Sequence, residues 1–157
     1  MKKICILLFF PSLLVIGQKK QQIDSLLQVY QTAVEDSIKL KARNRITSYS
    51  LYRDIKKAKS FANEQLALSR KINDLHAETK ALNHFSTIYS RLSQYDSAQY
   101  YIEKTLELAV STNNLAQQSI SNHSWVIMEI DRGNFEKAME LNKKNIAFNQ
   151  EIRDTLG

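Results

Sequence analysis

The feature that most restricts the fold of this chain is a pattern of residue types that recurs every 40 residues. Alanine stands at three equivalent positions, and bulky apolar residues share several others without a gap in the register. The equivalent sets are Ala58, Ala98 and Ala138; Ile55, Tyr95 and Phe135; Phe61, Tyr101 and Leu141; Leu66, Leu106 and Ile146; and Leu68, Leu108 and Phe148. A repeat of this length indicates structural units that bury their apolar faces against neighbouring units.

Each unit contains helices. In the middle unit, the apolar residues Ala98, Ile102, Leu106 and Ala109 follow one another at intervals of three or four positions, which is the spacing of one helical face. The whole sequence has only three glycines and one proline, and a strand-rich fold with many tight turns needs more of both. These observations predict an all-α fold.

Residues that favour helix ends keep the same period. Good N-caps stand at Asp74, Asn114 and Asp154, and a second break falls inside each unit, at Asp54, Gln94 and Asn134. Asn114 with Gln117 resembles a capping box, and Gly133 favours a helix stop. Each unit is therefore expected to be two antiparallel helices. The predicted ranges are a short helix over 21–31 and helix pairs over 37–52 and 55–72, 75–92 and 95–112, and 115–132 and 135–152.

The first 17 residues have the character of a secretory signal. Lys2 and Lys3 precede an apolar run that ends before Gly17, and the run is shorter than the roughly 20 residues that span a bilayer. Export to the periplasm or the medium is the expected localisation, with an uncleaved membrane anchor as the alternative. Cys5, the single cysteine, lies within this segment, so no disulfide is expected in the mature chain. The expected organisation is a signal over 1–17, a helix and connection over 18–36, and a repeat domain over 37–157 with units at about 37–73, 74–113 and 114–154.

The segment "ALNHFSTIYSRLSQYDSAQYYIEKTLELA", residues 81–109, resembles a tetratricopeptide repeat unit. Leu82, Phe85 and Tyr89 match the large residues of the first helix of that motif, and Ala98 matches the small residue where the two helices cross. Ser86 and Thr105 replace small residues of the motif, and the period of 40 exceeds the usual 34. The resemblance extends over about residues 37–152 and implies a right-handed α-solenoid of antiparallel helix pairs.

The resemblance also implies a function. Solenoids of this family bind a protein or peptide in a concave groove lined by the first helix of each pair. Carried over to this chain, the inward positions are Arg43, Thr47, Ser50, Lys80, Asn83, Thr87, Arg91, Ile120, His123, Ile127 and Ile130. Arginine and asparagine donors suit a peptide carboxylate or backbone. The other interpretations are that these side chains merely face solvent, or that further repeats cover the isoleucines.

Two alternatives to a free-standing interaction module remain open. Similar exported repeats occur as the extracytoplasmic part of sensor histidine kinases and of membrane-tethered helix-turn-helix regulators, which implies a sensor fragment as the alternative function. A histidine-dependent enzyme or metal-binding protein is the minor alternative, since His84 and His123 lie on neighbouring first helices. No motif for catalysis, cofactor binding or metal ligation occurs, so none of these is predicted.

The charge and the paired tyrosines have simple interpretations. A net charge of +6 spread over several helical faces is typical of a solvated surface, and no nucleic-acid partner is expected. Tyr101 shares the apolar stripe of the repeat and is expected in the core. Tyr100 has Ser60 and Glu140 at its equivalent positions, and is therefore expected on an outer face. A contact between the last repeat and another chain or further repeats is also expected.

Overall fold

A computed structural model describes residues 10–156, and this part of the chain is entirely α-helix and connecting turns. The helices are α1 (Phe10–Thr32), α2 (Asp36–Ser50), α3 (Ile55–Lys71), α4 (Leu75–Arg91), α5 (Tyr95–Ser111), α6 (Leu115–Arg132) and α7 (Phe135–Leu156). The predicted all-α class is confirmed. Over the described residues, no helix combines the length and the apolar character that crossing a bilayer requires.

The helix ranges agree closely with the prediction between residues 37 and 152, and differ at both ends. At the C-terminal end, α7 continues through Asp154, so the prediction of an N-cap there is wrong. At the other end, α1 begins at Phe10, well before the expected start near residue 21. Gly17 lies inside α1. A single glycine weakens a helix by only about 1 kcal/mol, so it does not have to end the helix. The predicted signal lies partly outside the described residues, because nothing is described of residues 1–9.

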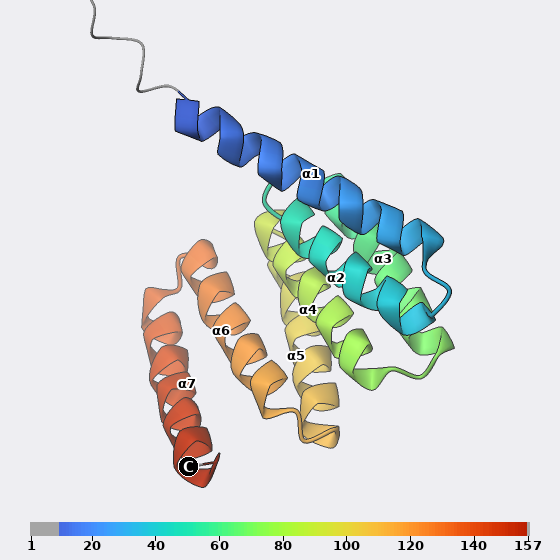
Figure 1. The fold of residues 1–157 in the computed structure, drawn as a ribbon. Helices are drawn as coiled ribbons and strands as arrows, with labels where there is room; N and C mark the ends of the chain where they lie inside the picture. The colour runs from blue at the N-terminus through green and yellow to red at the C-terminus, as the bar shows by residue number, and fades with distance from the viewer. Residues whose placement is uncertain (1–9, 157) are drawn as a thin grey trace, which may run out of the picture.

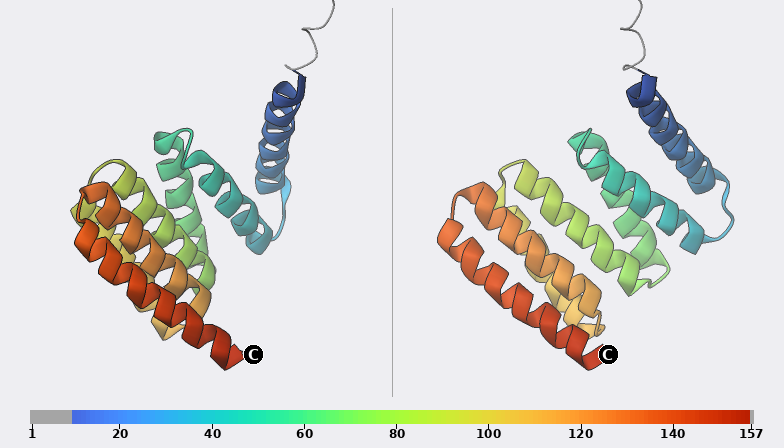
Figure 2. Two further views of the ribbon diagram at one scale, coloured as in Figure 1. Left: turned by 90° about the vertical axis from the view of Figure 1, so that its left-hand side faces the viewer. Right: turned by 60° about the vertical axis from the view of Figure 1, so that its left-hand side comes forward.

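The helices form a curved stack of two layers (Figures 1 and 2). Each helix packs against the next one along the chain, and α4 also contacts both α2 and α6. In the described part of the chain, no comparable contact joins α3 to α5. The even-numbered helices are therefore the closely spaced inner layer, and α3 and α5 lie behind them, further apart.

Four of the turns have the same construction, at 20-residue intervals. The residues at their centres, Asn73, Ser93, Asn113 and Gly133, all have positive φ angles. The next amide donates to the carbonyl oxygen five residues earlier, at 2.7–2.9 Å, in the pairs Asp74–Ser69, Gln94–Tyr89, Asn114–Ala109 and Asn134–Glu129. This is the Schellman arrangement, which satisfies carbonyls left free at a helix end. The sequence predicted a break at each of these four places, but a helix stop of this kind only at Gly133.

Side-chain caps start three of the helices. Asp54 accepts from the Lys57 amide at 3.0 Å, Asp74 from Ala77 at 2.9 Å, and Asn114 from Gln117 at 3.2 Å. Gln94 makes no side-chain cap. The capping box expected at Asn114 is only half formed, because the Asn114 amide donates instead to the carbonyl of Ala109.

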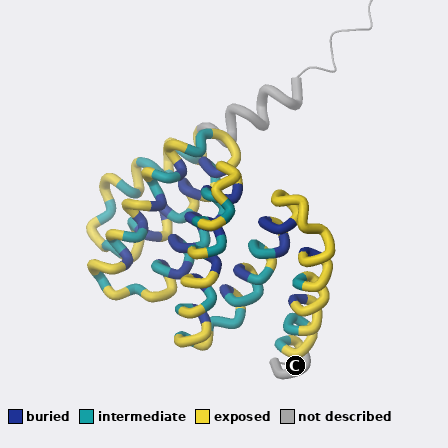
Figure 3. The backbone as a smooth tube through the Cα atoms, turned by 180° about the vertical axis from the view of Figure 1, so that it is seen from behind, coloured by how far each residue is buried: buried dark blue, intermediate teal, exposed yellow. Residues whose placement is uncertain are grey.

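The core lies between the two layers, and alanines allow the helices to approach closely. One cluster joins Ala58 and Ala62 of α3 to Phe85 and Ile88 of α4. A second joins Ala98 and Ile102 of α5 to Met128 of α6. Figure 3 shows the buried residues on the surfaces where helices face one another. Burying apolar surface here supplies the main stabilisation, at about 25 cal/mol per Å².

Tyr101 is half-buried in this core, as predicted. Its ring stacks on Phe85 with centroids 4.9 Å apart and on Tyr89 at 5.3 Å. The ring of Tyr100 meets it edge-on at 5.2 Å and 84°, and the Tyr100 side chain is 54% exposed. The prediction of an outer position for Tyr100 is confirmed.

Candidate partner-binding groove

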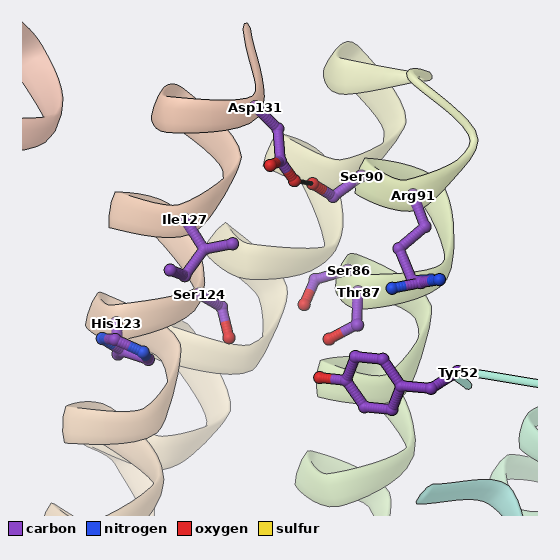
Figure 4. Close-up of a pocket in the computed structure, with 9 residues that line it drawn as sticks. All are labelled: Tyr52, Ser86, Thr87, Ser90, Arg91, His123, Ser124, Ile127 and Asp131. Carbon is purple, nitrogen blue, oxygen red and sulfur yellow. Dashed lines mark hydrogen bonds between the residues drawn. The ribbon is translucent and has the colours of Figure 1, made fainter. Parts of the chain in front are cut away.

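The clearest candidate site is a cavity of about 360 Å³ between α4 and α6 on the inner layer. Figure 4 shows side chains of both helices directed into the space between them, with Tyr52 entering from the turn after α2. The lining residues are Tyr52, Ser86, Thr87, Ser90, Arg91, His123, Ser124, Ile127 and Asp131. A cavity of this size lies within the range of ligand-binding pockets, at about 300–1,000 Å³.

Arg91 supplies the positive charge of this cavity. Its guanidinium lies over the ring of Tyr52, 4.8 Å from the ring centroid (Figure 4). None of the ion pairs among the described residues involves Arg91. Arg91 is also exposed. Because a guanidinium presents a planar set of donors to carboxylates, the unneutralised Arg91 is suited to hold an anionic group of a partner.

The part of the cavity around Asp131 is polar and fixed by hydrogen bonds between helices. The Ser90 hydroxyl donates to Asp131 Oδ2 at 3.0 Å, and the Tyr95 hydroxyl donates to the Asp131 carbonyl at 2.8 Å. Nearer the middle, the Ser124 hydroxyl donates to Asn83 Oδ1 at 3.1 Å. These bonds hold α4 and α6 in a fixed relation, so the cavity is formed before any ligand binds.

Four of the predicted groove residues line this cavity together: Thr87, Arg91, His123 and Ile127. Ile127 is 41% exposed and provides an apolar surface. A smaller cavity of about 190 Å³ is lined by three more predicted residues, Lys80, Asn83 and Ile120, together with Asn44, His84 and Gln117. Both cavities lie along α4 and α6, and the Ser124–Asn83 hydrogen bond joins a lining residue of each. We refer to the two cavities together as the groove.

The structure places Arg43 and Thr47 elsewhere, which corrects their prediction as groove residues. Arg43 is 3% exposed and Thr47 is fully buried. The Arg43 guanidinium lies 3.5 Å from the centroid of the Tyr30 ring and pairs with the carboxylate of Glu64. The cause is α1, which packs on α2 and covers this part of the first unit. Ser50 is buried as well.

His84 belongs to a buried polar network that joins three helices. Its Nδ1 lies 3.1 Å from Gln65 Oε1, and its Nε2 lies 3.1 Å from the Ser48 hydroxyl. Burial, with a smaller contribution from the positive charge of Lys80, lowers the pKa of His84 to about 4. His84 is therefore a neutral structural residue at ordinary pH, and it faces a different cavity from His123.

Several lining residues were not predicted from the sequence: Tyr52, Ser86, Ser90, Ser124 and Asp131. Ser86 and Ser90 are each adjacent in sequence to a predicted residue, and a wider helical face would have included them. Tyr52 lies in a turn, where the position of the side chain depends on how the first unit packs against the second. No local pattern in the sequence contains that information.

No protein-family model fits the sequence, and no curated protein is significantly similar to it. The geometry of the groove therefore carries the functional argument. Among the described residues, no group of three or more His, Cys, Asp or Glu side chains is arranged to hold a metal ion.

Proposed function

We propose that this chain is an exported helical-repeat module of the tetratricopeptide type, without catalytic activity, that binds a protein or peptide in the groove between α4 and α6. In this proposal the helix pairs form a right-handed solenoid, and the partner lies along its inner layer. The observation that carries the proposal is the exposed guanidinium of Arg91, held over Tyr52 at the edge of a preformed cavity. Arginine and tyrosine are both enriched among the residues that dominate protein interfaces.

The chemistry of the groove supports a peptide rather than a compact small molecule. The groove offers a cation in Arg91, an anion in Asp131, an apolar contact in Ile127 and several hydroxyl groups between them. A peptide presents acidic, basic and apolar groups together with backbone donors and acceptors at regular intervals. Separate points of recognition along two cavities fit such an extended ligand.

Partner capture with a charge-reversed variant tests the proposal. We expect immobilised Arg91→Glu to retain about tenfold less partner from an extract of the exported fraction than the wild-type chain retains, because repulsion replaces an ion pair. The melting temperature should fall by no more than a few degrees, since Arg91 is exposed and the substitution removes only its contact with Tyr52 and a favourable charge at the end of α4.

Lys143→Glu is the matched control. Lys143 is exposed on α7, away from the groove, and its substitution changes the net charge by the same amount. It should capture as much partner as the wild-type chain. If Arg91→Glu captures as much as Lys143→Glu, the groove is not the binding surface; if both lose capture equally, binding depends on overall charge alone.

A further inference from the structure

A second cavity, of about 530 Å³, lies on the other layer of the molecule, between α3 and α5. These two helices make no close contact with each other in the described structure, while α4 packs against both. The start of α4 therefore forms the floor of the cavity, and α3 and α5 form its walls. None of the residues that line it contributes to the groove between α4 and α6.

One part of this cavity is lined by apolar side chains that are already in place. Leu66 of α3, Leu82 of α4 and Leu108 of α5 line it together with Tyr101. The Tyr101 ring is held in place by stacking on Phe85 and Tyr89 of α4. Because rigid side chains shape the cavity before a ligand arrives, little ordering free energy opposes binding.

Two ion pairs form the rim, and they differ in how firmly they are held. Arg70 Nε lies 2.7 Å from Glu78 Oε1, and the Glu78 side chain is only 16% exposed. Lys104 Nζ lies 2.8 Å from Glu107 Oε2, and both of these side chains are largely in solvent, at 48% and 70% exposed. An exposed pair of this kind is stabilised by about 0–1 kcal/mol. Glu107 therefore turns into water at little cost and leaves Lys104 available.

Arg70 also retains donors that face outwards. Among the described residues, Arg70 makes a single hydrogen bond, through Nε, so the two Nη groups remain for another acceptor. Arg70 and Lys104 stand on opposite walls of the cavity. Arg70 and Lys104 thus present cationic donors across the mouth of the cavity, each beside a carboxylate, Glu78 or Glu107. Leucine side chains of all three helices lie below them.

We propose that the cavity between α3 and α5 binds a small anionic amphiphile, with its apolar body among Leu66, Leu82 and Leu108 and its anionic group on Arg70 and Lys104. The volume lies within the range of small-molecule pockets, about 300–1,000 Å³. The ligand is a single dissolved molecule such as an alkyl or aryl carboxylate, since the cavity has room for one body of that size and its two cations, Arg70 and Lys104, lie at the rim.

The test uses three probes with the same apolar chain: decanoate, decanol and decyltrimethylammonium, titrated as monomers into the full chain by calorimetry. Decanoate should bind at least about tenfold more tightly than decanol, the difference that one good charged contact supplies, and the cationic probe should bind weakest. Equal affinity for decanoate and decanol, or no binding of decanoate at millimolar concentration, would overturn the proposal.

Variants identify the site. Lys104→Gln should weaken decanoate binding by about tenfold and leave decanol binding unchanged, and helical circular dichroism should stay the same because Lys104 is half exposed. Arg91→Glu, in the groove on the other layer, should bind decanoate as the wild-type chain does. Loss of decanoate binding in Arg91→Glu but not in Lys104→Gln would place the ligand in the groove instead. Binding to anionic vesicles without binding to monomeric decanoate would also contradict the proposal, since a membrane surface would then be the ligand.

Discussion

The α4–α5 pair and the α6–α7 pair carry the same repeat register but are stabilised by different chemistry. In the first pair, Phe85, Tyr89 and Tyr101 stack on one another with centroids 4.9–6.4 Å apart. The positions 40 residues later hold Trp125, Glu129 and Leu141. The apolar stack of the first pair is thus replaced by a mixed cluster around a carboxylate. The repeat register fixes where equivalent side chains lie. It does not fix whether apolar packing or polar contacts stabilise them.

Glu129 shows how the second pair accommodates that change. It is fully buried, and its Oε1 lies 2.9 Å from Lys137 Nζ while its Oε2 accepts from Asn134 at 2.8 Å. Burial alone would raise the pKa of Glu129, but the hydrogen bonds from Asn134 and Lys137 and the lysine charge outweigh it and lower the pKa. The carboxylate therefore stays ionised, held by residues that start the next helix.

The two pairs also differ in how far they are covered. Helix α5 packs between α4 and α6, whereas α7 packs against α6 alone among the described helices. Tyr95 and Leu106 of α5 are half-buried, while Phe135 and Ile146, at the equivalent positions of α7, are 65% and 50% exposed. Figure 3 shows α7 largely exposed along its outer side. Equivalent residues therefore contribute unequally to stability.

Truncating the central aromatic residue of each pair gives the largest expected difference. Phe85 is 2% exposed, so Phe85→Ala should lower the free energy of unfolding by about 3–5 kcal/mol through lost burial and a cavity. Trp125 is only half-buried, and Trp125→Ala should cost clearly less despite the larger side chain. Urea denaturation followed by circular dichroism measures both.

Tyr100→Ala serves as the surface control for this comparison. Tyr100 is 54% exposed, so its truncation should change the free energy of unfolding by less than about 1 kcal/mol. A Trp125→Ala loss equal to that of Phe85→Ala would mean that the two pairs are equally well packed, and would remove the contrast drawn between them.

The sequence predicts the helices and their pairing well, because both depend on local rules. The 40-residue stripe and the caps at Asp54, Asp74 and Asn114 place the helix ends between residues 37 and 132 within a few positions. The prediction failed at Asp154, where a good N-cap residue lies inside α7. A capping side chain favours a helix start, but does not break a helix that the preceding residues continue.

The groove is only partly predictable, since it depends on contacts between units. Thr87, Arg91, His123 and Ile127 are brought together as the register implies. The prediction of Arg43 as a groove residue failed because Tyr30 of α1 covers it. The repeat pattern does not predict where a helix that precedes the repeats lies. The buried network around His84 could not be predicted either, because its hydrogen-bond partners come from two other helices.

Acidification tests how α4 is held against α2 and α3 by the buried network around His84. Its pKa is about 4 when folded and about 6.5 when unfolded. Below pH 6.5 the unfolded chain takes up a proton that the folded chain does not, so stability falls as the pH drops from 6.5 to 4 and this loss then levels off. The expected loss is about 3 kcal/mol, at 1.36 kcal/mol per pKa unit.

The measurement is urea denaturation at several pH values between 7 and 4, compared with His84→Gln. The variant should lose less stability than the wild-type chain over this window, because it lacks the imidazole. His123→Gln changes an exposed imidazole of α6 and should leave the pH dependence as it is. Parallel curves for the wild-type chain and His84→Gln would show that the buried imidazole does not control acid stability.

The smallest expected effect comes from enlarging the alanine at the helix crossing of each pair. Ala98 is fully buried in the cluster with Ile102 and Met128, and α5 has neighbours on both sides. Ala98→Leu should therefore cost about 1–3 kcal/mol through overpacking. Ala138 is also buried, at 4% exposed, but α7 packs against a single helix and can shift outwards to accept the larger side chain. Ala138→Leu should cost clearly less, as measured by urea denaturation. Equal losses would show that α7 is held as firmly as α5, and a negligible loss for Ala98→Leu would contradict the close crossing of α5 with its neighbours.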